Sequence, residues 1–103
     1  MKIYLFCNLG LSTSILVDSM MESATKKGME IEVKAYPISE LSTYAQELDA
    51  ALLGPQVGYR LKEAKAICDR VNVPVGAVPM QAYGMCDGEA VLEFAVSLIN
   101  GKE

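Results

Sequence analysis

The feature that most constrains the fold is an apolar strand pattern that runs directly into a turn of small residues and then into a helix pattern. The apolar run Ile3-Tyr4-Leu5-Phe6 precedes Cys7-Asn8-Leu9-Gly10-Leu11-Ser12-Thr13-Ser14, and a helix-like pattern follows as far as Lys27. Such a turn directs backbone N–H groups and the positive end of the helix toward one point, which suits an anion such as phosphate. The same field stabilises a thiolate over a thiol. We therefore expect Cys7 to lie at a phosphate cradle formed by residues 8–14.

Strand and helix patterns alternate along the rest of the chain. The strand patterns cover residues 2–6, 29–36, 49–53 and 74–78. The first and last helix patterns cover residues 15–27 and 88–100. The second is a short helix with Ser39 as its N-cap and the apolar stripe Leu41, Tyr44, Ala45 and Leu48. The third has the apolar stripe Leu61, Ala64, Cys68 and Val71. Residues 79–84 are expected to form a loop. This order predicts an α/β fold, with right-handed crossovers and helices on both faces of one parallel sheet.

The second strand pattern fixes the expected strand order. Residues 29–36 alternate apolar and polar side chains, which is typical of an edge strand with one solvated face. The order is therefore predicted to be 2-1-3-4 in a single four-stranded sheet, within one domain over residues 1–103. In open sheets of this kind ligands bind beyond the carboxyl ends of the strands, where the winding reverses. That point lies between the first and third strands, where Cys7 and the segment Gly54-Pro55-Gln56 leave the sheet.

Composition excludes several functions. The net charge of -4 and the scattered basic residues disfavour nucleic-acid binding. With no histidine in the chain, the usual catalytic base and the commonest metal ligand are missing, so we expect no metal or other cofactor. No apolar run reaches about 18 residues, so no membrane insertion is expected. The N-terminus enters a strand pattern without a signal sequence, and a cytoplasmic location follows as the expectation.

Three uses of a cysteine in such a cradle compete. A cysteine phosphatase would place an arginine six residues after the nucleophile, but that position is Thr13 and the first arginine is Arg60. A redox protein would place a second cysteine at position 10, which is Gly10. A carrier needs phosphate-holding amides and hydroxyls without the groups that speed hydrolysis. The loop favours the carrier, while a phosphatase-like enzyme and a non-catalytic phosphate-binding module remain alternatives; Cys68 and Cys86 are expected to be structural.

Three segments resemble one known family. Cys-x-x-Gly-x-Ser-Thr-Ser after a strand, then Leu52-Leu53-Gly54-Pro55-Gln56-Val57 and Tyr83-Gly84-Met85-x-Asp87-Gly88, resemble the enzyme IIB component of the sugar phosphotransferase system, of the lactose/cellobiose/chitobiose type. The resemblance spans essentially the whole chain. It implies a flavodoxin-like or phosphatase-like three-layer sandwich.

The resemblance also implies a mechanism. A IIA protein that carries phosphate on a histidine would phosphorylate Cys7, and the membrane IIC component would present the sugar that receives the phosphoryl group. Asn8, Leu9, Gly10, Leu11, Ser12, Thr13 and Ser14 would hold the phosphate. The protein would be cytoplasmic and would meet the membrane only through IIC, and the sugar is not specified by this chain. Residues expected on neighbouring strand-end loops, and therefore candidate partner contacts, are Gln56, Tyr59, Met80 and Tyr83.

Overall fold

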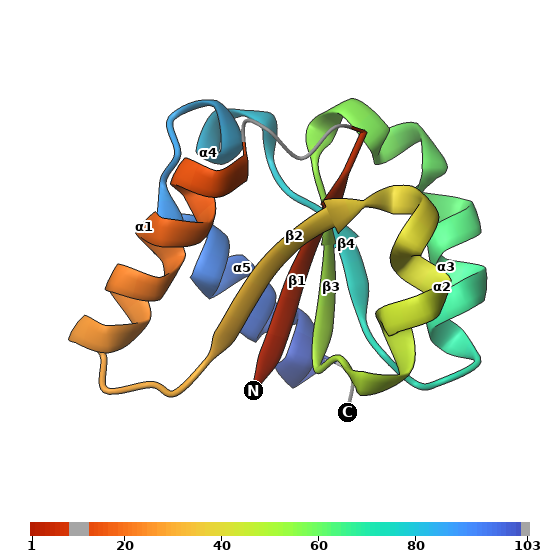
Figure 1. The fold of residues 1–103 in the computed structure, drawn as a ribbon, viewed down its shortest axis with the longest axis horizontal. Helices are drawn as coiled ribbons and strands as arrows, with labels where there is room; N and C mark the ends of the chain where they lie inside the picture. The colour runs from red at the N-terminus through yellow and green to blue at the C-terminus, as the bar shows by residue number, and fades with distance from the viewer. Residues whose placement is uncertain (9–12, 102–103) are drawn as a thin grey trace.

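The computed structural model describes residues 1–8 and 13–101, and within them it shows one parallel sheet between two layers of helices (Figure 1). The strands are β1 (Lys2–Cys7), β2 (Glu32–Pro37), β3 (Ala50–Leu53) and β4 (Val75–Ala77), in the order β2-β1-β3-β4. All three pairings are parallel. The α-helices are α1 (Thr13–Lys26), α2 (Leu41–Tyr44), α3 (Leu61–Asp69), α4 (Met80–Gly84) and α5 (Gly88–Gly101). The predicted fold class and strand order are confirmed.

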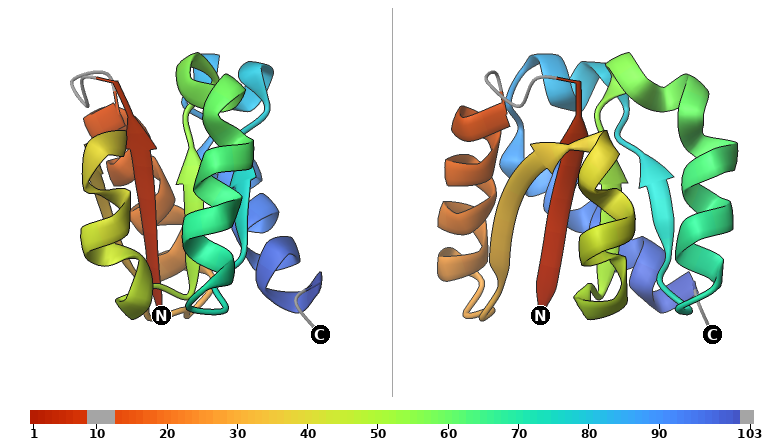
Figure 2. Two further views of the ribbon diagram at one scale, coloured as in Figure 1. Left: turned by 90° about the vertical axis from the view of Figure 1, so that its right-hand side faces the viewer. Right: turned by 45° about the vertical axis from the view of Figure 1, so that its right-hand side comes forward.

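The central strand β1 divides the core in two. Ile3 and Leu5 point to one face of the sheet, where α1 and α5 pack. Tyr4 and Phe6 belong to the core cluster on the other face, with residues of α2 and α3. Figure 2 shows the sheet between these two helices and the pair α1 and α5. Because both faces of β1 are covered, its side chains are almost all apolar and buried, as expected for an inner strand of a parallel sheet.

The predicted helix stripes supply the helical part of the core. Buried residues from the predicted stripes are Leu16, Met20 and Ala24 of α1, Leu41, Ala45 and Leu48 of the second crossover, Ala64 and Cys68 of α3, and Leu92 and Ala95 of α5. The prediction for Val71 was wrong: α3 ends at Asp69, and Val71 is exposed in the turn that follows. Asn72 adopts a left-handed conformation there (φ 59°), which turns the chain back toward β4.

The second strand is shorter than its alternating pattern. It begins at Glu32 rather than at Met29, because the N–H of Met29 donates to the carbonyl of Ala24 and closes the end of α1. The N–H of Gly28 donates to the carbonyl of Thr25, and Gly28 has a φ of +70°. These two hydrogen bonds form a Schellman cap, which requires a left-handed residue at this position and favours glycine. Sheet pairing therefore starts only after the cap.

Two local predictions were wrong at turns. Ser39 is not an N-cap: it lies inside a 3-10 turn (Ile38–Glu40) whose preceding residue, Pro37, makes no side-chain cap. A further 3-10 turn (Ala45–Glu47) follows α2, so this crossover consists of short pieces. The expected loop at residues 79–84 contains the short helix α4, in which the N–H of Tyr83 donates to the carbonyl of Pro79. The fixed φ of proline suits the start of such a helix.

Candidate active site at the carboxyl end of the sheet

Cys7 is the last residue of β1, where the chain leaves the sheet toward α1. It pairs in register with Pro37 of β2 and is only 4% exposed. Its position in the alternation of β1 matches that of Ile3 and Leu5, so its side chain belongs to the α1 side of the sheet. The strand thus places one thiol, nearly covered, at the predicted reversal of the winding.

The predicted phosphate-holding loop is described only at its two ends. Asn8 follows Cys7 and is exposed, and Ser14 is exposed in the first turn of α1. Leu9, Gly10, Leu11 and Ser12 lie outside the described residues, as does the side chain of Thr13, with which α1 begins. The structure therefore confirms that the loop joins a strand to a helix. The contacts of the loop with phosphate stay a prediction.

Gly54 brings the ends of β1 and β3 together beside the thiol. Its N–H donates to the carbonyl of Phe6 at 2.8 Å. A Cβ atom placed on Gly54 would lie 3.3 Å from the Cβ of Cys7, 3.0 Å from Oε1 of Gln56 and 3.5 Å from Cε2 of Tyr83. Three side chains from three strand ends therefore meet at one point. Glycine leaves that point open, because a Cβ there would crowd Gln56 and Cys7 and touch Tyr83.

The predicted contact residues separate into two groups. Gln56 and Tyr83 lie against Gly54, as Cys7 does. Tyr59 and Met80 instead point to solvent, with exposures of 80% and 75%. Gly54 was not among the predicted site residues. The signal for it was its position directly after an apolar strand, in Leu53-Gly54-Pro55.

Large apolar side chains gather around this end of the sheet. Among the described residues, the four most exposed ones are Ile15 of α1, Tyr59 of the 3-10 segment Pro55–Arg60, Met80 of α4, and Met85 just after α4, with exposures of 66–80%. We call these four residues the apolar rim. All four lie on segments that follow the carboxyl ends of strands, at the end of the molecule opposite the N- and C-termini (Figure 1). Sequence reasoning missed Ile15 and Met85. Their exposure makes these four residues candidates for contact with another macromolecule.

The segment that carries Cys7 is uncharged. The sequence from Ile3 to Val17 contains no charged residue. Arg60, at the end of the 3-10 segment that follows β3, forms an ion pair with Glu63 at 3.0 Å. An anion on Cys7 would therefore be held by backbone N–H groups, hydroxyls and amides rather than by a guanidinium fork. This arrangement matches the prediction of a carrier better than that of a phosphatase.

The other cysteines have different environments. Cys68 is fully buried in α3, and burial, with a smaller contribution from Asp69, raises the pKa of its thiol to about 11. A buried thiol of raised pKa is a poor nucleophile. Cys86 lies at a left-handed turn (φ 52°) between α4 and α5. None of the three cysteines forms a disulfide, and the described residues hold no cluster of acidic, cysteine or histidine side chains suited to a metal ion.

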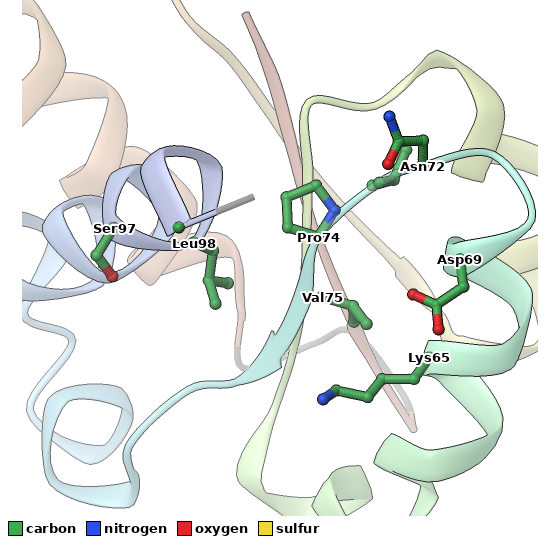
Figure 3. Close-up of a pocket in the computed structure, with 9 residues that line it drawn as sticks. Lys65, Asp69, Asn72, Pro74, Val75, Ser97 and Leu98 are labelled. Atoms are coloured by element: carbon green, nitrogen blue, oxygen red, sulfur yellow. The ribbon is translucent and has the colours of Figure 1, made fainter. Parts of the chain in front are cut away.

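One hollow of the molecule lies away from the thiol. It measures about 450 Å³ and opens between α3, the start of β4 and the end of α5 (Figure 3). Its lining includes Lys65, Asp69, Asn72, Val75, Ser97 and Leu98. Because β4 begins there and Cys7 stands where β1 ends, this hollow belongs to the opposite end of the sheet.

No helix in the described part of the chain is both long and apolar enough to span a bilayer.

Comparison with known proteins places the chain in a family. The family model described as "PTS system, Lactose/Cellobiose specific IIB subunit" matches residues 2–94. The oligo-beta-mannoside-specific EIIB component of Bacillus subtilis is 39% identical over 98 residues, and the galactose-specific EIIB component of Lactococcus lactis is 35% identical over 103; each alignment covers 95% of both chains.

Solved structures agree with this placement. The cellobiose-specific IIB protein of Borrelia burgdorferi has a TM-score of 0.82 at 31% identity and covers 100% of this chain and 94% of its own. The lactose-specific IIB domain of Streptococcus pneumoniae has a TM-score of 0.85 at 17% identity, with 95% and 96% covered, and supports the fold alone. The chain therefore belongs to the lactose/cellobiose-specific IIB family of the sugar phosphotransferase system.

Proposed function

We propose that this protein is a phosphocysteine carrier that accepts a phosphoryl group on Cys7 from a phosphohistidine of a IIA protein. The Sγ atom attacks phosphorus, the P–N bond breaks, and the imidazole of the partner takes the bonding electron pair and the thiol proton. In the second transfer a sugar hydroxyl held by the membrane IIC component attacks the same phosphorus. The S–P bond then breaks, the thiolate leaves, and the hydroxyl proton returns to sulfur.

The observation that carries this proposal is the position of Cys7. It is the last residue of the central strand, at the reversal of the winding, beside Gly54 and in a stretch of sequence without charged residues. The segment from Asn8 to Ser14 would hold the phosphoryl group with backbone N–H groups and hydroxyls. Because no histidine is present in the chain, the imidazole of the first transfer must come from the partner.

The apolar rim supports docking of protein partners over the thiol. Its four side chains surround the end of the sheet at which Cys7 lies, and IIA and IIC must each reach that sulfur. Tyr59 and Met80 are thus proposed as partner contacts, together with Ile15 and Met85. We place the protein in the cytoplasm as one carrier domain over residues 1–103, without a cofactor and joined to the membrane through IIC.

The choice of sugar is assigned to IIC. Relatives at 35–39% identity are named for an oligo-beta-mannoside, galactose and cellobiose. Carriers this similar are thus paired with different sugars, which is expected if the carrier recognises two proteins and a phosphoryl group only.

The test is intact mass of the protein after incubation with a phosphorylated IIA, followed by peptide mapping. We expect one added phosphoryl group, located on Cys7. Turnover of an aryl phosphate by the isolated protein would favour the phosphatase-like alternative. Phosphate binding without modification of the thiol would favour a non-catalytic binding module. Phosphate on any other residue would refute the assignment of Cys7.

A further inference from the structure

We infer that the side-chain amide of Gln56 is a direct contact for the phosphoryl group on Cys7 and stabilises the phosphorylated state. This inference rests on the proposed function and adds a residue outside the Asn8–Ser14 loop. Gln56 follows β3, so it reaches the thiol from the neighbouring strand. The phosphoryl group would then be held from two sides.

The position of the amide is the first support. Gln56 is exposed, and its Oε1 lies 3.0 Å from the point where a Cβ of Gly54 would be. The Cβ of Cys7 lies 3.3 Å from that same point. The amide and Cys7 therefore both lie against Gly54, on neighbouring strand ends. Rotation of the amide by half a turn exchanges its oxygen and nitrogen, so its N–H groups can face a phosphoryl oxygen in the same place.

The charge of the surroundings is the second support. No charged residue occurs between Ile3 and Val17, and Arg60 is engaged by Glu63. The stretch of sequence that carries Cys7 thus offers a phosphoryl dianion neutral donors alone, and Gln56 would add one more from the neighbouring strand. A neutral amide adds a hydrogen bond to the anion without the bidentate cation with which a phosphatase stabilises the hydrolytic transition state.

The proposed role predicts a shift in an equilibrium. Phosphoryl exchange between IIA and this protein has an equilibrium constant set by the stability of the two phosphorylated proteins. A residue that only improves docking changes the forward and reverse rates equally and leaves that constant unchanged. A residue that contacts the phosphoryl group changes the constant itself.

The experiment compares Gln56→Glu with wild type, using a IIA protein phosphorylated on its histidine as the donor. The carboxylate has nearly the shape of the amide but repels the dianion, so we expect the exchange equilibrium, read by intact mass, to shift about tenfold toward phosphorylated IIA. Gln46→Glu, at an exposed position before β3, is the matched control and should exchange like wild type. The melting temperature of each variant checks that it is folded.

A second pair of variants tests how the amide is held. Gly54→Ala should push the amide of Gln56 aside and shift the exchange equilibrium about threefold in the same direction. In a Gln56→Ala background the same change at Gly54 should have little further effect, since no amide remains to be displaced. If Gly54→Ala shifts the exchange equilibrium as much in the Gln56→Ala background as in wild type, the methyl group acts on Cys7 directly. That result would refute the claim that Gly54 positions the amide of Gln56.

The outcomes separate this inference from the proposed function. Wild-type phosphocysteine at Cys7 with an unchanged equilibrium in Gln56→Glu would refute the role of Gln56 alone, and so would rates slowed equally in both directions. A wild-type protein that takes no phosphate on Cys7 would refute the proposed function and this inference together.

Discussion

Replacing Gly88 by alanine should destabilise the fold, because α5 begins in direct contact with the backbone of α1. A Cβ on Gly88 would lie 2.3 Å from the carbonyl carbon of Ser19 and 2.5 Å from the nitrogen of Met20. The N–H of Gly88 also donates to Oγ of Ser19 at 3.0 Å, which fixes the start of α5 against α1. The absence of a side chain at position 88 allows this close approach.

The loss of stability in Gly88→Ala is large because the new methyl group would collide with backbone atoms of α1. Backbone atoms inside a helix cannot rotate aside, so the two helices must move apart by about 1 Å to reach ordinary contact distances of about 3.5 Å. The buried side chains between them, including Met20 and Leu92, would then lose part of their packing. Overpacking typically costs 1–3 kcal/mol, and we expect the upper end, about 3 kcal/mol. For a domain of this size that lowers the melting temperature by about 15 °C.

The assay is thermal and urea unfolding followed by circular dichroism, with Gly84→Ala as the matched control. Gly84 is also helical, but a Cβ there would meet no atom within 4 Å. That variant should be as stable as wild type or more stable by about 0.5 kcal/mol, because alanine favours the helix. A Gly88→Ala protein as stable as Gly84→Ala would refute the reasoning, since it would show that α1 and α5 can separate at no cost.

Three further predictions concern the thiol and its strand. Cys7→Ser should fold normally and take no phosphate from IIA, because a hydroxyl without a base beside it is a weak nucleophile. Cys68→Ala should still be phosphorylated, and its free energy of unfolding in urea should fall by about 1 kcal/mol. Thr13→Arg should accept phosphate but lose it to water about tenfold faster, as measured by intact mass after IIA is removed; unchanged decay would show that the missing arginine does not protect the bond. The hydrogen bond from Tyr4 lowers the pKa of the Glu32 carboxyl, so its contribution to stability is present above the ordinary pKa of 4.5 and is lost as pH falls through the lowered value. Tyr4→Phe should therefore flatten the acid limb of a stability profile, and an unchanged acid limb would contradict that linkage.

Periodicity predicted the elements that bury a long apolar face. The stripe Leu16, Met20 and Ala24 and the continuous apolar strand β1 were predicted because burial itself imposes their spacing. The first and last residues of these elements were harder to predict from the sequence. Residues 29–31 continue the alternation of β2, but the cap of α1 takes the N–H of Met29, and no side-chain pattern reports that hydrogen bond.

The sequence predicted those site residues whose own side chains carry the chemistry, and missed those whose role depends on the fold. Cys7 and Gln56 carry reactive or polar groups at strand ends, so their chemistry and position could both be seen in the sequence. Gly54 could be recognised in the sequence only as the residue that leaves an apolar strand, and the meeting of other side chains over it depends on the folded structure. The exposure of Ile15 and Met85 depends on how neighbouring segments fold around them, which local patterns do not encode.

The hydrogen bond between Tyr4 and Glu32 has a consequence for the direction of the thiol. Tyr4 is buried on the α2 side of β1, and its hydroxyl reaches Glu32 on the adjoining edge strand. Sliding β1 by one residue would turn every side chain of the strand to the opposite face, leaving this hydroxyl buried without its carboxylate at a cost of about 1–3 kcal/mol. The same slip would aim the sulfur of Cys7 away from α1. A tyrosine three residues upstream thus helps to keep the reactive group on the α1 side of the sheet, so the register that folds stably is also the register that positions the sulfur.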